Sequence, residues 1–145
     1  MSSEKSVPQL DAGRTFTMTM PVRWGDMDAV GHVNNTIYFR FVEEARAQCF
    51  DAENLFFPHG RVPILVHASL DFLKSVIYPA TVVVRLVLTR QGTSSLAFDV
   101  EIECDGEPGV LYAKGHNIVV ATRRDTGRSA PWTAHEIEGL ARAFV

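Results

Sequence analysis

The groups whose types and spacing could do chemistry gather in one stretch over residues 24–35. It reads Trp-Gly-Asp-Met-Asp-Ala-Val-Gly-His-Val-Asn-Asn and supplies two carboxylates, one histidine and two amides. An apolar helical pattern over residues 36–50 follows at once. These groups therefore lie at an expected helix start, where backbone N–H groups are unpaired and the macrodipole is positive. Such N–H groups can hold an oxyanion beside a carboxylate catalyst, which indicates acyl transfer to water.

The composition allows one folded domain and favours no nucleic-acid or membrane partner. A chain of 145 residues, 46% of them apolar, can form one hydrophobic core and is too short for two typical domains. Residues 1–13 are polar and predict a flexible tail, which leaves 14–145 as the domain. The net charge of -3 gives no general attraction to nucleic acid or anionic lipid. Because we find neither a signal-peptide core nor the roughly 20 apolar residues of a membrane span, we expect a cytoplasmic protein.

The hydrophobic pattern along the chain predicts an α+β domain. Helical spacing predicts helices over 36–50 and 133–144, and alternation predicts antiparallel strands over 14–23, 64–73, 81–90, 96–104 and 110–122. Residues 51–63 are expected to form a connection, and Asn34 or Asn35 is the expected N-cap of the first helix. That helix is apolar over most of its circumference, so a flat sheet on one side would leave apolar surface in water. A curved sheet that wraps the helix would bury this surface.

The element order and the loop string together resemble a known family. The string Asp-x-Asp-x-x-Gly-His-Val-Asn-Asn, with Tyr38 and Glu-Glu-Ala-Arg over residues 43–46 beyond it, resembles the hydroxybenzoyl-CoA thioesterase-like branch of the hotdog-fold acyl-CoA thioesterases. The resemblance covers residues 14–122 and implies the α+β hotdog fold, in which a curved antiparallel five-stranded sheet wraps a long central helix. It also implies hydrolysis of an acyl-CoA to free acid and CoA, with no cofactor, by a homodimer or a homotetramer (dimer of dimers).

The resemblance also implies roles for residues of the loop. Asp28, the second aspartate of the pair, is the implied catalytic carboxylate, either as nucleophile on the thioester carbonyl or as general base on a water. The implied oxyanion donor is the backbone N–H of Asn35. Asp26 is expected to shape the loop, by accepting backbone N–H bonds or by holding Arg23. Further groups that could orient water, the thioester or the loop are His32, Asn34, Asn35 and Tyr38.

The substrate is expected to be a fatty acyl-CoA. The His-Val-Asn-Asn ending of the loop string is more similar to the fatty acyl-CoA thioesterases of the superfamily than to its aryl-CoA members. Exposed basic residues beside turns are the expected partners of the CoA phosphates. The candidates are Lys74, Arg90 with Thr93 and Ser94, and Arg123 with Arg124 and Arg128. Subunits of this fold usually pair their sheets edge to edge, so residues of both chains would line each active site.

Ligand spacing favours neither a metal site nor a serine hydrolase. The loop begins like a calcium-binding EF-hand loop, but Val30 and Ile37 occupy its fifth and twelfth positions, where oxygen ligands are required. The histidines have no HxxxH or HExxH spacing, so no metal is expected. The Gly-Thr-Ser-Ser run over residues 92–95 lacks the second glycine of a nucleophile elbow.

Other interpretations of the same residues stay open. A hydratase or dehydratase acting on acyl thioesters would pair a histidine with an acid on or near the central helix, whereas His59 follows that helix. A thioesterase could use a helix acid, Glu43 or Glu44, in place of the loop aspartate. An acyl-CoA binding module would keep the fold without turnover. A purely structural loop would satisfy both aspartates with backbone N–H groups and Arg23.

Overall fold

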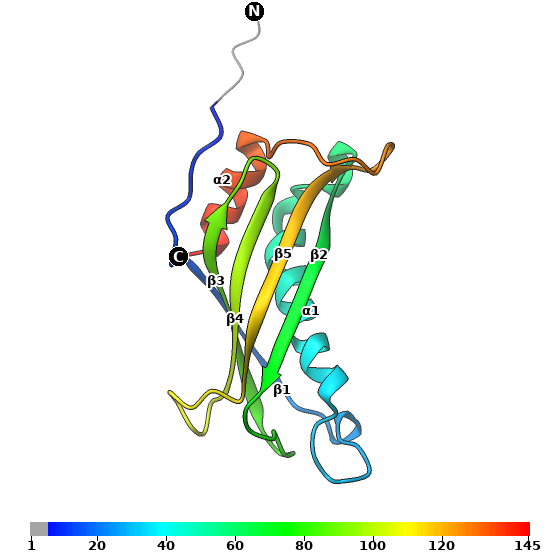
Figure 1. Ribbon diagram of the computed structural model, residues 1–145, viewed down its shortest axis with the longest axis vertical. Coiled ribbons are helices and arrows are strands. Elements are labelled where there is room, and N and C mark those ends of the chain that lie inside the picture. Colours follow the sequence, from blue (N-terminus) through cyan, green and yellow to red (C-terminus); the bar gives the residue numbers. More distant parts are fainter. Residues whose placement is uncertain (1–5) are drawn as a thin grey trace, which may run out of the picture.

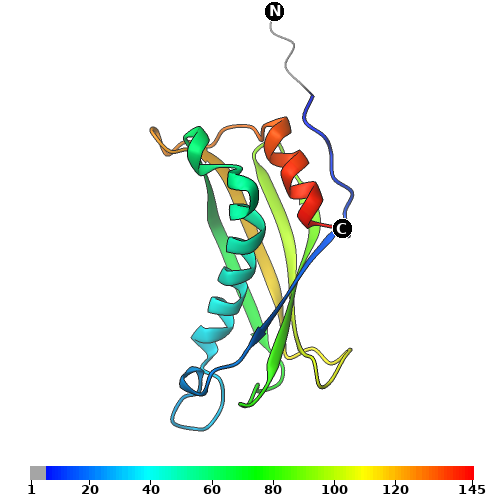
Figure 2. The same ribbon diagram turned by 180° about the vertical axis from the view of Figure 1, so that it is seen from behind.

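The chain forms a curved antiparallel sheet with a long helix on its concave face. The structure, a computed structural model, describes residues 6–145, and its sheet has the strand order β1-β3-β4-β5-β2. The strands are β1 (Thr15–Pro21), β2 (Arg61–Phe72), β3 (Thr81–Gln91), β4 (Ser95–Cys104) and β5 (Ala113–Arg123). The helices α1 (Asn35–Asp51) and α2 (Ala134–Ala143) lie on the same face of this sheet (Figure 1, Figure 2). This arrangement confirms the predicted α+β hotdog fold.

The core lies between α1 and the concave face of the sheet. The cleanest predicted alternation, in β4, buries Leu96, Phe98, Val100 and Ile102. Helix α1 contributes one buried stripe, formed by Tyr38, Phe41, Val42, Ala45, Cys49 and Phe50. The helix is buried over less of its circumference than predicted, because Phe39 of the expected apolar stripe is 37% exposed. Arg40, Glu43 and Glu44 are exposed on its outer face, as their charges indicate.

Strand β2 is longer than predicted and forms one edge of the sheet. It begins at Arg61, inside the predicted connection, and pairs with β5 from its first residue. Proline is tolerated on an edge strand, where one row of backbone groups has no ladder partner, so Pro63 does not end the strand. The strand exposes large apolar side chains, namely Ile64 (42%), Leu65 (37%), Val66 (58%) and Phe72 (40%). An exposed apolar edge of this kind marks an interaction surface.

Both terminal segments are anchored to the sheet. The predicted tail over 1–13 lies partly outside the described residues, and its later part is not loose. Leu10 is buried and donates its N–H to the side-chain oxygen of Gln91 at 2.9 Å. Helix α2 is held by Glu136, which is 1% exposed and accepts hydrogen bonds from Arg61 at 2.8 and 2.9 Å.

The turn between β4 and β5 is longer than predicted, because β5 begins at Ala113 rather than at residue 110. Glu103 of β4 fixes this turn by accepting hydrogen bonds from the N–H of Gly109 at 2.9 Å and from Arg85 at 2.8 Å. The backbone bond and then the guanidinium hold the pKa of Glu103 below its ordinary value of 4.5. The carboxylate therefore stabilises the fold while it is charged.

The connecting segments gather at two opposite ends of the sheet (Figure 1). Residues 22–34, residues 73–80 and the turn between β4 and β5 lie at one end, where α1 also begins. The turn between β3 and β4 and the connection from β5 to α2 lie at the other end. Within one chain, a site built from these connecting segments can draw only on the segments of one end.

Candidate active site

The loop over residues 24–34 is held in shape by Asp26. This aspartate is 8% exposed, and its carboxylate accepts the N–H of Arg23 at 2.9 Å. Its backbone carbonyl accepts the N–H of Asn34 at 3.0 Å, so the two ends of the loop are joined. The guanidinium of Arg23 also approaches the carboxylate, with 4.0 Å between Nε and Oδ1. Asp26 thus shapes the loop in both of the ways the sequence predicted.

Asp28 lies in a tight turn that leaves its side chain exposed. Its N–H donates to the carbonyl of His32 at 2.8 Å, and its own carbonyl accepts the N–H of Gly31 at 3.1 Å. Gly31 has φ 80°, which a residue with a side chain rarely adopts, so glycine makes this turn possible. One carboxylate oxygen accepts the N–H of Val30 at 3.0 Å. This local bond fixes the direction of the carboxylate, and among residues 6–145 no group occupies its second oxygen, which is therefore open to a reactant.

Helix α1 begins directly beyond this turn. The side-chain oxygen of Asn34 accepts both the N–H and the hydroxyl of Thr36, at 2.9 and 2.7 Å, and Asn34 is therefore the N-cap. The N–H of Asn35, the first helical residue, donates to no other group within residues 6–145. That N–H group is thus available to a ligand at the positive end of the helix.

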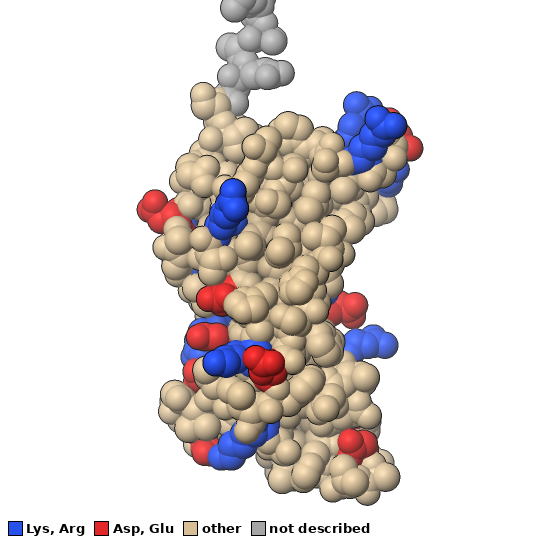
Figure 3. Space-filling view, in the orientation of Figure 1, with Lys and Arg blue, Asp and Glu red and all other residues tan. Residues whose placement is uncertain are grey.

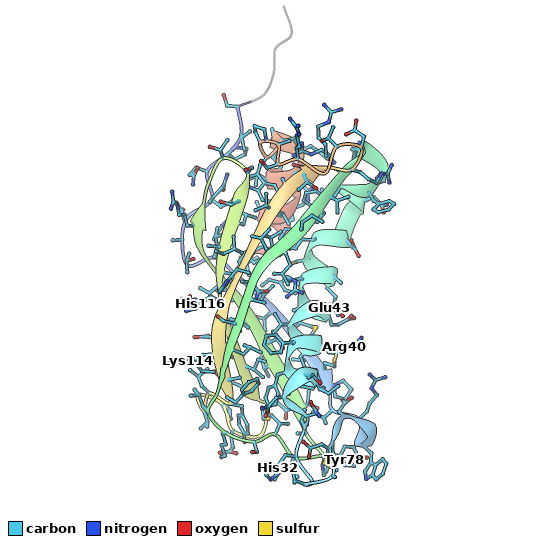
Figure 4. All side chains as sticks on the ribbon, turned by 45° about the vertical axis from the view of Figure 1, so that its right-hand side comes forward. His32, Arg40, Glu43, Tyr78, Lys114 and His116 are labelled. Atoms are coloured by element: carbon cyan, nitrogen blue, oxygen red, sulfur yellow. The ribbon has the colours of Figure 1, made fainter. Side chains whose placement is uncertain are left out.

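A cavity of about 470 Å³ brings most of the predicted residues together. Its lining includes Asp28, His32, Asn34, Asn35, Tyr38 and Lys74. Phe72 and Leu73, at the end of β2, supply apolar surface to the same cavity. In Figure 4, His32 lies at the lower end of the molecule together with Tyr78, whereas Arg40 and Glu43 lie farther up α1. The cavity therefore combines a carboxylate, a free backbone donor and an apolar wall.

The Tyr38 hydroxyl, a group that could orient water, the thioester or the loop, already has hydrogen-bond partners within the described residues. Its single proton goes to the carbonyl of Lys74 at 3.3 Å, and its oxygen accepts the N–H of Val76 at 2.9 Å. Burial raises the pKa of this phenol, so the hydroxyl stays protonated. Sequence reasoning gave no sign of the contact with Val76, because the two residues are far apart in the chain.

Lys74 lies in the wall between two cavities. Its ammonium group binds both carboxylate oxygens of Glu107 at 2.9 Å and lies 5.1 Å from the ring centre of Tyr112. The hydrogen bond to Glu107 raises the pKa of Lys74. Tyr112 also donates to Glu107, and this bond, before that of Lys74, lowers the pKa of the carboxyl. These side chains line a second cavity of about 440 Å³, and the sequence did not indicate that Glu107 belongs there.

The other predicted phosphate partners lie away from this cavity. Arg90 and Ser94 flank the turn between β3 and β4, at the opposite end of the sheet. Arg123 lies at that end too, where its guanidinium pairs with Asp125 at 2.9 Å. Figure 3 shows Lys and Arg side chains grouped at the upper right, over the connection that follows β5. Of the candidates Lys74, Arg90, Ser94 and Arg123, a single chain therefore places only Lys74 in the cavity that contains Asp28.

Residues 6–145 contain neither a cluster of metal ligands nor a helix that could cross a membrane. No group of three or more His, Cys, Asp or Glu side chains in this range could hold a metal ion. Among the helices of the same residues, none combines the length and the apolar character that crossing a membrane would demand.

The fold is that of the hotdog class, and membership of a thioesterase family makes the chain a thioester hydrolase. The chain belongs to the thioesterase-like superfamily, since the model of that family matches residues 22–144.

Solved structures resemble the chain over most of its length. The PA2801 protein from Pseudomonas aeruginosa, described as a candidate thioesterase, is 41% identical with a TM-score of 0.74, covering 81% of this chain and 91% of that one. A predicted thioesterase from Bacillus stearothermophilus is 28% identical with a TM-score of 0.77, and the match covers 90% of this chain and 97% of that protein. Slr0204, a 1,4-dihydroxy-2-naphthoyl-CoA thioesterase from Synechocystis, has a TM-score of 0.76, and the match covers 88% of this chain and 96% of Slr0204. At 23% identity, Slr0204 shares the fold.

Proposed function

We propose that the protein hydrolyses a fatty acyl-CoA to the free acid and CoA, with Asp28 as the catalytic carboxylate. The observation that supports this most is the shared cavity, in which the Asp28 side chain and the free N–H of Asn35 lie at the start of α1. The family is one of thioester hydrolases. Slr0204, which shares the fold, acts on 1,4-dihydroxy-2-naphthoyl-CoA, so it agrees with the CoA part of the proposed substrate and not with a fatty acyl group. Because CoA esters are intracellular metabolites, the proposed location is the cytoplasm.

In the proposed reaction, the thioester carbonyl oxygen accepts a hydrogen bond from the Asn35 N–H. As the carbonyl carbon becomes tetrahedral, this oxygen gains charge that the helix N-terminus stabilises. One donor of this kind is worth about 2.7–4 kcal/mol of barrier. Asp28 either attacks the carbonyl carbon, giving an anhydride that water then hydrolyses, or takes a proton from the attacking water.

The leaving group needs little help from an acid. The C–S bond breaks and its electron pair stays on sulfur, because a thiol is far more acidic than an alcohol; that of cysteine, for example, has a pKa of about 8.5. His32 lines the same cavity, and in the proposed reaction it would orient the attacking water. One carboxylate and one backbone donor therefore suffice for the chemistry, and the proposal requires neither a metal nor a cofactor.

The alternatives have less support from the geometry. Glu43 pairs with Arg40 at 3.9 Å on the outer face of α1 and lines a separate cavity of about 240 Å³. His59, the histidine that a hydratase would need near the central helix, lies in a cavity with Arg61 and Arg123 at the opposite end of the sheet. Neither side chain lines the cavity that contains Asp28.

We also propose that two copies pair along β2, which would cover the exposed side chains of Leu65 and Val66. A two-fold axis perpendicular to the sheet makes the two β2 strands antiparallel, so the start of one lies beside the end of the other. Arg123 of the partner subunit would then approach the end of β2 that leads to Lys74, where the CoA phosphates need cations. Figure 3 shows few charges on the upper part of the outer sheet face, which suits two dimers packing as a tetramer.

The function is tested by following thiol release from a panel of short, medium and long fatty acyl-CoAs and aryl-CoAs. The proposal expects release from fatty acyl-CoAs, with the highest kcat/KM at one range of chain lengths. Faster turnover of aryl-CoAs than of every fatty acyl-CoA would contradict the proposed substrate. Saturable binding of CoA esters with no thiol release would instead favour the binding module.

The dimer is tested by Val66→Lys, which places a charge on the exposed part of β2. We expect the wild type to be a dimer or tetramer by light scattering and the variant to be monomeric, with lower affinity for the CoA ester. Val7→Lys is the matched control, because Val7 is also an exposed apolar residue but lies before β1. A monomeric wild type, or a Val66→Lys variant that stays oligomeric, would contradict this pairing.

A further inference from the structure

The segment over residues 73–76 is a wall shared by the two cavities at the start of α1. Lys74 and Ser75 line both the cavity that contains Asp28 and the second cavity beside it. On one side this segment is held by the carbonyl of Tyr112, which accepts the N–H groups of Leu73 and Lys74 at 2.9 and 3.1 Å. On the other side the segment contacts α1 through the Tyr38 hydroxyl. Within the described residues, no other side chain forms a hydrogen bond between this segment and α1.

A continuous set of hydrogen bonds runs from this tyrosine to the catalytic loop. The Tyr38 oxygen accepts the N–H of Val76 at 2.9 Å, and the carbonyl of Val76 accepts the N–H of Val33 at 2.9 Å. Val33 and Val76 are 2% and 0% exposed, so both bonds are shielded from water. Val33 also forms an antiparallel bridge with Met27, which neighbours Asp28. Val33 thus stands between the proposed carboxylate and the proposed backbone donor, Asn35.

We propose that Tyr38 is a positioning residue for the active site. By holding Val76, its hydroxyl fixes Val33 and so sets the distance between the Asp28 carboxylate and the Asn35 N–H. Tyr38 lies one helical turn beyond Asn35, which ties the wall directly to the helix that carries the donor. This inference rests on the proposed function, and it assigns the tyrosine a role in geometry rather than in proton transfer.

The role belongs to the hydroxyl and not to the ring. The ring packs edge-to-face against Phe72 and Phe41, with centroids 5.1 and 6.2 Å away, and a phenylalanine would keep both contacts. Tyr38→Phe therefore removes two hydrogen bonds and leaves the buried N–H of Val76 without its partner. The position of the loop should change more than the packing of the core.

The test compares Tyr38→Phe with Thr122→Val. Thr122 is a suitable control because its buried hydroxyl also donates to a backbone carbonyl, that of Val62 at 2.8 Å, at the opposite end of the sheet. We expect Tyr38→Phe to lower kcat about tenfold or more for every substrate while KM changes less than about threefold, because misplaced reacting groups slow the chemical step. Thr122→Val should leave kcat and KM unchanged, even if its thermal stability falls as much as that of Tyr38→Phe.

Amide hydrogen exchange gives a second readout that needs no activity. In Tyr38→Phe, the Val33 amide should exchange about tenfold faster or more than in the wild type, whereas Thr122→Val should leave it unchanged. An unchanged kcat or an unchanged Val33 amide in Tyr38→Phe would overturn the inference. If the wild type hydrolyses no thioester, the exchange result still decides whether Tyr38 holds the loop. If Tyr38→Phe does not fold, the wild type still provides a test. The inference requires the Val33 and Val76 amides to open together, so clearly different exchange rates for these two amides would overturn the inference.

Discussion

Asn34 offers a way to separate the stability of α1 from the charge at its N-terminus. In the structure its side-chain oxygen accepts the N–H and the hydroxyl of Thr36, so it caps the helix whose next N–H is the proposed oxyanion donor. Asn34→Ala removes this cap and should cost about 1 kcal/mol of stability. Asn34→Asp keeps an acceptor in the same place and should be as stable as the wild type, because a negative charge at a helix N-terminus is favourable.

The effect of the two substitutions on kcat should be the reverse of their effect on stability. A carboxylate about 6 Å from the developing oxyanion repels it by about 3 kcal/mol at an effective dielectric constant of about 20, which is roughly a hundredfold in kcat. Asn34→Asp should therefore be stable and slow, whereas Asn34→Ala should be less stable and lose less activity. Urea unfolding and thiol-release kinetics on both variants measure the two quantities. An Asn34→Asp variant with wild-type kcat would refute the placement of the oxyanion beside this helix start.

Three further predictions concern stability and thiol chemistry. Glu103→Gln should destabilise the protein by about 1–3 kcal/mol at neutral pH. Folding lowers the pKa of this carboxyl below 4.5. In urea unfolding across pH, the difference in stability between wild type and Glu103→Gln should therefore be fully present above pH 4.5 and should be lost as the pH falls through the folded-state pKa. Gly115→Ala should lower stability by about 3 kcal/mol or more in the same assay, because an added Cβ would lie 1.8 Å from the backbone oxygen of Ser69. Cys49 and Cys104 should not react with Ellman's reagent at pH 7.5 until denaturant is added, because both are buried, and burial raises the pKa of both thiols, that of Cys49 to about 12.

The parts of the fold that could be predicted depend on local pattern. The alternation in β4 needs only neighbouring residues, and Asn34 caps α1 through a residue two positions away. Asp28 and Asn35 line the same cavity because a single short loop joins them, so this arrangement could also be predicted. The role of Asp26 was predictable for the same reason, since Arg23, the partner of its carboxylate, lies only three positions before it.

Contacts between distant segments could not be predicted in this way. The start of β2 at Arg61 depends on pairing with β5, and local proline content pointed to a connection instead. The engagement of the Tyr38 hydroxyl by Val76, and of Lys74 by Glu107, follows from where the sheet places segments more than thirty residues apart. Sequence periodicity carries no information about such pairs, because each depends on the completed tertiary structure.

The central claim is that Asp28 is the catalytic carboxylate, and the most direct measurement compares Asp28→Asn with Glu43→Gln. Both substitutions replace a carboxylate by an amide of the same shape on an exposed side chain, so both proteins should stay folded. With the best substrate of the panel, at matched oligomeric state, we predict that Asp28→Asn lowers kcat a hundredfold or more, about 2.7 kcal/mol of barrier. Glu43→Gln should stay within about threefold of the wild type. An active Asp28→Asn enzyme, or a loss confined to Glu43→Gln, would contradict this account.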